Sequence, residues 1–128
     1  MRLHLDTSFL IDMHRRDPKV LPLLEQILAR DHAVSVDPIV ETEFFAAPIV
    51  PRRKEAAYKS ILAVGVALPL RSDAARLAAS WLARMDPPQR RAHFADALIA
   101  AMASVHSATL VTGDLALRRV FPVAVLEY

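Results

Sequence analysis

Four acidic side chains could act together in this sequence, although long stretches of chain separate them. Asp6 and Asp114 directly follow predicted strands, while Glu43 and Asp96 lie in early turns of predicted helices. Carboxylates packed together repel one another, and a divalent cation relieves that repulsion. Oxygen ligands suit Mg²⁺ or Mn²⁺, and such a metal can polarise a phosphoryl oxygen and lower the pKa of a bound water. The acids therefore predict metal-dependent phosphodiester chemistry, with one of them available as a general base.

Each of the four acids also has an ordinary structural explanation. Asp6 could cap the helix that follows it, and Asp114 could cap the last helix. Glu43 could be an exposed helical acid. The helix dipole favours an anion in the first turn, such as Asp96, by about 0.3 to 1 kcal/mol. The metal hypothesis thus depends on all four acids sharing one edge of the fold.

Five short apolar segments predict strands that alternate with helices. We expect strands at residues 2–5, 33–36, 66–70, 109–112 and 123–126, and helices at 8–15, 18–30, from 38 onward, 52–64, 72–85, 93–105 and 115–120. In the helix that ends near residue 85, Ser72 is the expected cap. Because parallel strands need crossover connections, this order predicts an α/β fold: a three-layer α/β/α sandwich around a mainly parallel sheet. In such a sheet the loops after the strands line the ligand crevice, where the acids could converge.

Length and composition limit the alternatives. A chain of 128 residues, 54% of them hydrophobic, can bury one core, which predicts a single domain over residues 1–128. The absence of cysteine excludes a disulfide framework, a thiolate zinc site and a cysteine nucleophile, and it favours a reducing cytoplasm. Asp6 interrupts the N-terminus before an apolar run could form a signal sequence or a membrane span. We therefore expect a cytoplasmic protein without a membrane anchor.

The charge permits a polyanionic partner. The formal net charge is +2 and the sequence pI is about 9.4. A single basic cluster is more often a solvated face than a binding site. Four such clusters occur, however, and together they allow contact with nucleic acid: Arg15-Arg16, Arg52-Arg53-Lys54, Arg90-Arg91 and Arg118-Arg119.

Four segments around the acids carry recognisable motifs. They read Leu5-Asp6-Thr7-Ser8-Phe9-Leu10-Ile11, Ser35-Val36-Asp37-Pro38-Ile39-Val40-Glu41-Thr42-Glu43, Ala95-Asp96-Ala97-Leu98-Ile99-Ala100-Ala101 and Leu110-Val111-Thr112-Gly113-Asp114. In this order and spacing they resemble the motifs of PIN-domain nucleases, in particular the VapC-type toxins of bacterial toxin-antitoxin pairs. The resemblance spans nearly the whole chain, and four ordered motifs form a strong signal.

The resemblance implies an Mg²⁺- or Mn²⁺-dependent endoribonuclease. In it, Asp6, Glu43, Asp96 and Asp114 would be the catalytic metal ligands, and Ser8 and Thr112 would support them through their hydroxyl groups. It also implies an RNA substrate, a cognate antitoxin protein that keeps the enzyme inactive, and a homodimer.

The chain departs from the family pattern in two places. Many relatives carry a further Asp two or three residues after the fourth acid, where this chain has Ala116 and Leu117, so a second metal would be held weakly. Ala47 stands where relatives often have glycine, which affects only local backbone geometry.

Two other functions fit parts of the sequence. Asp6 could be the covalent nucleophile of a phosphohydrolase similar to haloacid dehalogenases, but that family expects a second Asp where Ser8 stands. The other is a non-catalytic, metal-binding PIN-like module that engages a protein or an RNA, which the missing acid after Asp114 favours. RNA cleavage with added metal distinguishes the nuclease from this module.

The remaining polar and aromatic candidates have structural interpretations. We expect His4 to be structural, His93 to be a surface or capping residue, and Trp81 to serve in helix packing or a dimer contact. Exposed apolar side chains near the crevice could accept an amphipathic segment of an antitoxin; we expect them at Phe44, Phe45, Ile49 and Val50.

Overall fold

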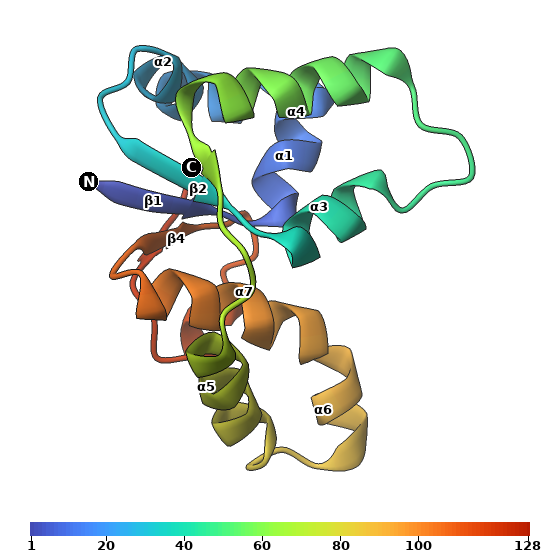
Figure 1. Ribbon diagram of the computed structural model, residues 1–128, viewed down its shortest axis with the longest axis vertical. Coiled ribbons are helices and arrows are strands. Elements are labelled where there is room, and N and C mark those ends of the chain that lie inside the picture. The colour runs from blue at the N-terminus through green and yellow to red at the C-terminus, as the bar shows by residue number, and fades with distance from the viewer.

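A five-stranded parallel sheet forms the centre of the computed structural model, which describes residues 1–128 (Figure 1). The strand order is β3-β2-β1-β4-β5, and every pairing is parallel. In the central strand, His4 lies opposite Ser35 on one side and Leu110 on the other. The strands are β1 (Arg2–Leu5), β2 (Ala33–Val36), β3 (Val66–Ala67), β4 (Thr109–Val111) and β5 (Val125–Leu126).

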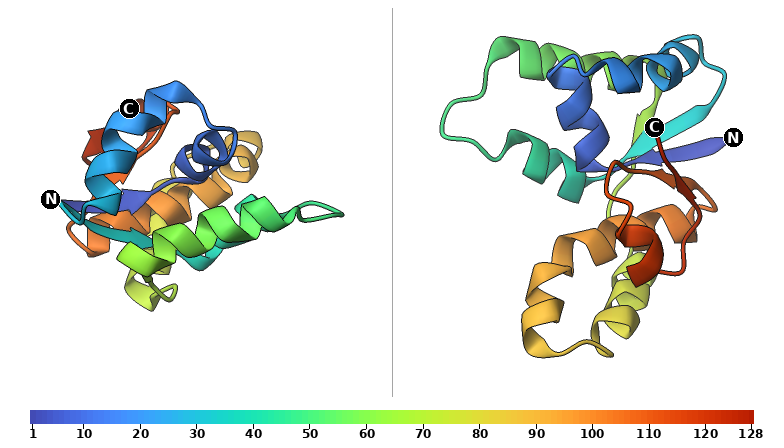
Figure 2. Two further views of the ribbon diagram at one scale, coloured as in Figure 1. Left: turned by 90° about the horizontal axis from the view of Figure 1, so that it is seen from above. Right: turned by 180° about the vertical axis from the view of Figure 1, so that it is seen from behind.

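Helices cover both faces of this sheet (Figures 1 and 2). On one side lie α1 (Thr7–His14), α2 (Leu21–Leu28) and α4 (Arg52–Val64). On the other lie α5 (Ser72–Leu82), α6 (Pro87–Ala92) and α7 (Phe94–Val105). Helix α3 (Pro38–Phe45) contacts both α1 and α7, and η1 (Pro18–Val20) and α8 (Leu117–Val120) are short. The predicted three-layer α/β/α sandwich is confirmed.

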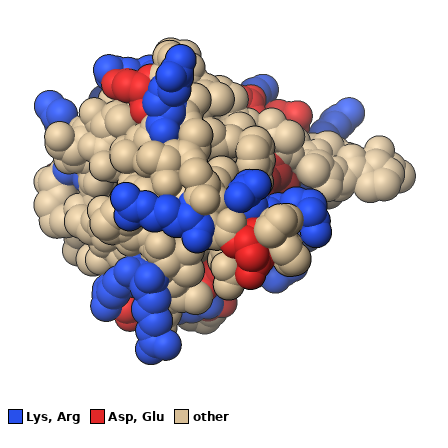
Figure 3. Space-filling view, turned by 90° about the horizontal axis from the view of Figure 1, so that it is seen from below, with Lys and Arg blue, Asp and Glu red and all other residues tan.

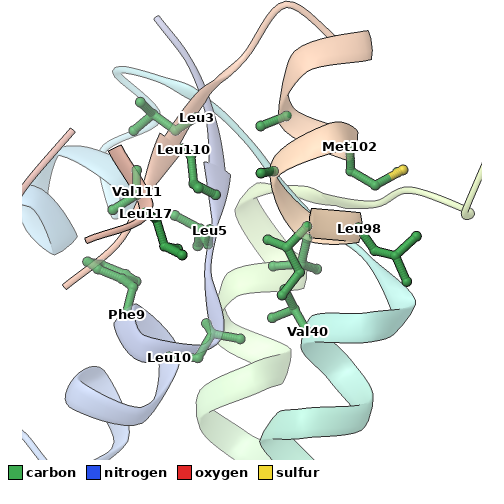
Figure 4. Packing of buried hydrophobic residues seen from close by; sticks show 14 of the residues in the cluster. Leu3, Leu5, Phe9, Leu10, Val40, Leu98, Met102, Leu110, Val111 and Leu117 are labelled. Carbon is green, nitrogen blue, oxygen red and sulfur yellow. The ribbon is translucent and has the colours of Figure 1, made fainter. Parts of the chain in front are cut away.

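The core lies between the central strands and the flanking helices. Leu3 and Leu5 of β1 are fully buried, and burial of such a side chain contributes about 1.5 to 3 kcal/mol. Phe9 and Leu10 of α1 lie on one side of β1, while Leu98 and Met102 of α7 lie on the other (Figure 4). Because residues 97–103 of α7 are all buried and four of them are alanine, this helix can approach the sheet closely.

Aspartate followed by proline starts three helical segments. Asp17, Asp37 and Asp86 each accept a hydrogen bond from a backbone amide of the turn that they precede. Asp86 caps α6, a helix that was not predicted: α5 already ends at Leu82, and the prolines after Asp86 occupy the first positions of the new helix.

Several predicted boundaries differ from the structure, among them those of α5, β3, β5 (predicted from residue 123) and α8 (predicted from residue 115). Ser72 was expected to cap a helix but is the first residue of α5, and Arg71 occupies the capping position without a side-chain hydrogen bond. Strand β3 ends at Ala67 rather than near Leu70, and Pro69 in this stretch has no amide hydrogen to continue a ladder. None of the helices is both long and apolar enough to cross a membrane.

Candidate active site

Asp6 lies where the central strand passes into α1, and three donors hold its carboxylate. Its Oδ1 accepts a hydrogen bond from the amide of Thr7 at 2.8 Å. Its Oδ2 accepts from the hydroxyl of Thr112 at 2.7 Å and from that of Ser8 at 3.1 Å. The side chain caps α1, as its structural interpretation predicted, and the residue is 5% exposed. The orientation of this acid is therefore fixed by two residues of α1 and by the residue that directly follows β4.

Glu43 reaches the same region from the last turn of α3. The hydroxyl of Thr7 donates to Oε1 of Glu43 at 2.7 Å. Glu43 is exposed, so this hydrogen bond orients a carboxylate that is open to solvent. Thr7 was not among the predicted site residues, although it lies within the Leu5–Ile11 motif.

Asp96 lies in the first turn of α7, and its side chain is 31% exposed. Burial raises the pKa of its carboxyl above the ordinary value, and the negative charges of Asp6 and Glu43 raise it further. His93 opposes this shift, because its Nδ1 lies 3.6 Å from a carboxylate oxygen of Asp96. The structure therefore brings Asp6, Glu43 and Asp96 within reach of one another's charge.

Asp114 is joined to this group mainly through its backbone. Its amide donates to the hydroxyl of Thr112 at 3.0 Å, and Thr112 in turn donates to Asp6. The exposed carboxylate of Asp114 accepts from the amide of Ala116 at 3.0 Å and closes the turn before α8. Its charge is not among those that raise the pKa of Asp96. The fourth acid is thus a neighbour of the other three, with its side chain engaged in a local turn.

The chemistry of these acids suits Mg²⁺ or Mn²⁺. As the side chains lie, no group of three His, Asp or Glu residues surrounds a common cation position. Mg²⁺, however, usually keeps several waters and binds one or two carboxylates together with substrate phosphate. Asp6 with Asp96 or Glu43 could supply that number of protein ligands. A cation would also relieve the repulsion that raises the pKa of Asp96.

Ser8 and Thr112 support the site as a pair. The hydroxyl of Ser8 accepts from the amide of Gly113 at 2.9 Å and lies 3.3 Å from the hydroxyl of Thr112. Nearby, Tyr128 donates its hydroxyl hydrogen to Asp12 at 2.6 Å, and a Cβ on Gly113 would lie 2.8 Å from that hydroxyl. The contacts of Tyr128 and Asp12 were not predicted, because they bring together the two ends of the chain.

A buried pair supports the two elements that carry Asp6 and Glu43. His4 is fully buried in β1, and its Nε2 lies 2.6 Å from Oδ2 of Asp37. Its Nδ1 lies 2.8 Å from the hydroxyl of Ser35. Asp37 also caps α3. His4 therefore has a structural role, as predicted, and ties β1 to the start of the helix that ends near Glu43.

The predicted apolar surface is only partly present. Phe44 is fully buried, which contradicts the expectation that it is exposed, because it packs against Phe45 and Tyr58 at ring-centroid distances of 5.1 and 6.2 Å. Ile49 is 83% exposed. The ring centroids of Trp81 and Phe121 lie 5.3 Å apart, in agreement with the predicted packing role of Trp81.

Positive side chains do not form one continuous stripe on the face shown in Figure 3. Lys and Arg occur there in several separate groups, some of them beside acidic side chains. On this face, basic side chains are therefore present only as separate clusters.

Comparisons with known proteins agree with the fold and with the order of the motifs. The family model for the PIN domain matches residues 3–121. No curated protein matches the sequence significantly. Among solved structures, the chain is similar to VapBC2 from Rickettsia felis bound to a fragment of promoter DNA, with a TM-score of 0.77, 15% identity and coverage of 99% of this chain and 98% of the other.

Two further solved structures cover almost the whole chain. FitAcB from Neisseria gonorrhoeae has a TM-score of 0.68 and 25% identity, with coverage of 97% of this chain and 96% of the other. A toxin-antitoxin complex from Klebsiella pneumoniae has a TM-score of 0.68 and 19% identity, with the same coverage.

Proposed function

The chain belongs to the PIN domain family, and from this premise we propose that it is a divalent-metal-dependent endoribonuclease that acts as the toxin of a toxin-antitoxin pair. One observation carries the proposal: Asp6, Glu43 and Asp96, from three distant segments, lie close enough for the charges of two to raise the pKa of the third. A fold without a metal-dependent function would gain nothing from this repulsion.

The residues have distinct roles in this proposal. Asp6 is the most firmly held ligand, because three hydrogen bonds orient its carboxylate. Asp96 and Glu43 would complete the ligand set, and Asp114 would join it only if its carboxylate released the amide of Ala116. Bound Mg²⁺ or Mn²⁺ would polarise the phosphoryl group of RNA and lower the pKa of a water molecule. Ser8 and Thr112 hold Asp6 in place.

The partner is inferred from the similar structures. One of them is a toxin-antitoxin complex, and the others are VapBC2 and FitAcB. We infer that a cognate antitoxin binds this chain in the cytoplasm and blocks access to the acids. The chain would also form a homodimer, as the family resemblance implies.

RNA cleavage is the decisive measurement. The purified chain should cut RNA when Mg²⁺ or Mn²⁺ is present and should stop when EDTA is added. Asp6→Asn and Asp96→Asn should each abolish cutting. Asp31→Asn is a matched control with the same charge change, since Asp31 is exposed and makes no side-chain hydrogen bond or ion pair. Circular dichroism would check that each variant is folded.

The engaged carboxylate of Asp114 favours one alternative function. Together with Ala116 and Leu117 in place of a further acid, it fits a metal-binding PIN-like module that engages a protein or an RNA without cutting it. Calorimetric Mn²⁺ binding that Asp6→Asn weakens, without cleavage of any RNA, would support this module and contradict the nuclease.

A further inference from the structure

Four cationic side chains from two distant segments gather around His14. Arg15 and Arg16 follow the end of α1, while Arg53 and Lys54 lie in the first turn of α4. We call these four residues the α1–α4 basic cluster. Burial lowers the pKa of His14, and the charges of Arg53, Lys54 and Arg15 lower it further. Arg16, the fourth member, lines a pocket of about 240 Å³ together with His14 and Arg53. The other lining residues are Met13, Ala56, Ala57 and Ser60.

The cluster has no internal charge compensation. None of its four members forms an ion pair, whereas Lys19, Arg71 and Arg118 each lie within 4 Å of a carboxylate. Glu55, the one acid beside Arg53 and Lys54 in the sequence, is exposed and forms no ion pair with them. Unpaired cations on two adjoining elements produce a local positive potential that attracts a polyanion.

The cluster lies about one helix length from the candidate active site, at the other end of α1. Phe44 directly follows Glu43, and Lys54 Nζ lies 4.8 Å from the centroid of its ring. The ring of His14 lies 6.1 Å from the same centroid. Asp6 caps the start of α1, and the cluster surrounds the end of the same helix. Because the eight residues of α1 span about 12 Å, this is the approximate distance between the two sites. One RNA strand could therefore contact both.

We propose that the α1–α4 basic cluster binds the phosphate backbone of the RNA strand that enters the acidic site. This inference rests on the proposed function, which requires a strongly anionic substrate next to repelling carboxylates. The planar guanidinium groups of Arg16 and Arg53 match phosphate geometry, and the pocket between them has room for a phosphate group. Such contacts make RNA binding depend strongly on salt.

The test is the salt dependence of RNA binding by Asp96→Asn, which keeps the RNA intact. A fluorescein-labelled single-stranded oligoribonucleotide is titrated in EDTA at several KCl concentrations. Each lost phosphate contact reduces the slope of log K against log salt by about 0.7 for single strands. Adding Arg16→Gln and Arg53→Gln should therefore reduce the slope by about 1.4 and weaken binding. The charge-preserving pair Arg16→Lys and Arg53→Lys should keep most of the slope.

Arg76→Gln with Arg84→Gln is the matched control, because both arginines are exposed, form no ion pair and lie outside the four basic clusters of the sequence. This pair should leave the slope unchanged. Equal slopes for the cluster and control variants would overturn the inference, even if the wild-type chain cuts RNA with Mn²⁺. If the cluster variants lose only the binding of an acidic protein partner, the surface belongs to that partner, and the RNA assignment is wrong. A slope that falls as expected in a chain that never cuts RNA would support the cluster and contradict the nuclease.

Discussion

Thr7 donates its hydroxyl hydrogen to Oε1 of Glu43 at 2.7 Å, and this bond joins the first turn of α1 to the last turn of α3. The amide of the same residue donates to Oδ1 of Asp6 at 2.8 Å. One residue thus orients two acids that are 37 positions apart in the sequence. The distance between these two carboxylates depends on Thr7 more than on any contact between them.

Thr7→Val should weaken metal binding while leaving the fold intact. Valine keeps the shape of the side chain but cannot orient Glu43, and removal of such a supporting group typically costs 10- to 100-fold in metal affinity. Calorimetric titration with Mn²⁺ measures the change. Thr42→Val is the control, because the hydroxyl of Thr42 donates only to the backbone of Pro38 in the same helix. Equal affinities in the two variants would show that Thr7 does not position a ligand.

The raised pKa of Asp96 predicts how the metal-free protein responds to pH. Because the folded pKa lies above the ordinary value of 3.8, the folded state binds a proton more tightly than the unfolded chain does. The free energy of unfolding contributed by Asp96 therefore falls as the pH rises from the unfolded pKa through the folded pKa.

Asp96→Asn should remove this fall in stability. We expect the variant to be more stable than the wild-type chain near neutral pH in EDTA, and the difference should shrink as the pH is lowered. Urea unfolding at several pH values measures it, with Asp31→Asn as the control. A variant that is less stable at neutral pH would mean that repulsion from Asp6 and Glu43 does not destabilise the metal-free site.

The sequence predicted the layers of this fold because its signals are local. Apolar runs gave the five strands, and aspartate followed by proline marked the start of helices such as α3. The same Asp-Pro signal occurs at Asp86, where it starts α6 four residues after α5 ends at Leu82, but it was not used there and α6 was missed. Strand β3 lies at the edge of the sheet, and it is shorter than predicted. Pro69 has no amide hydrogen to extend its ladder of hydrogen bonds.

The site was predictable only as far as sheet topology fixes it. Parallel strands end at a common edge, and this rule placed Asp6 and Asp114 near each other. It could not show that the carboxylate of Asp114 bonds to the amide of Ala116, because that choice depends on turn geometry. The pairing of His4 with Asp37 depends on the register of β1 against β2, which no local pattern reveals.

Asp37→Ala should cost more stability than the loss of a helix cap. Loss of a cap costs about 1 kcal/mol, and a buried hydrogen-bonding group that is left without its partner costs about 1 to 3 kcal/mol in addition. Asp37 has both roles, since it caps α3 and pairs with the buried His4. Asp86→Ala is the matched control, because Asp86 also precedes a proline but only caps α6. If urea unfolding gave equal costs for both variants, the buried pair would contribute nothing.

Alanine at the two glycines should have unequal effects, because different kinds of atoms surround them. A Cβ on Gly65 would lie 2.7 Å from the backbone oxygen of Val34, which cannot move without distorting β2, and such overpacking costs about 1 to 3 kcal/mol. A Cβ on Gly113 would lie 2.8 Å from the hydroxyl of Tyr128, at the end of a side chain that can rotate. Urea unfolding should show a smaller loss for Gly113→Ala, and Tyr128→Phe should reduce that loss further because it removes the nearest atom. A larger loss at Gly113 than at Gly65 would mean that the bond from Tyr128 to Asp12 holds the hydroxyl as rigidly as backbone.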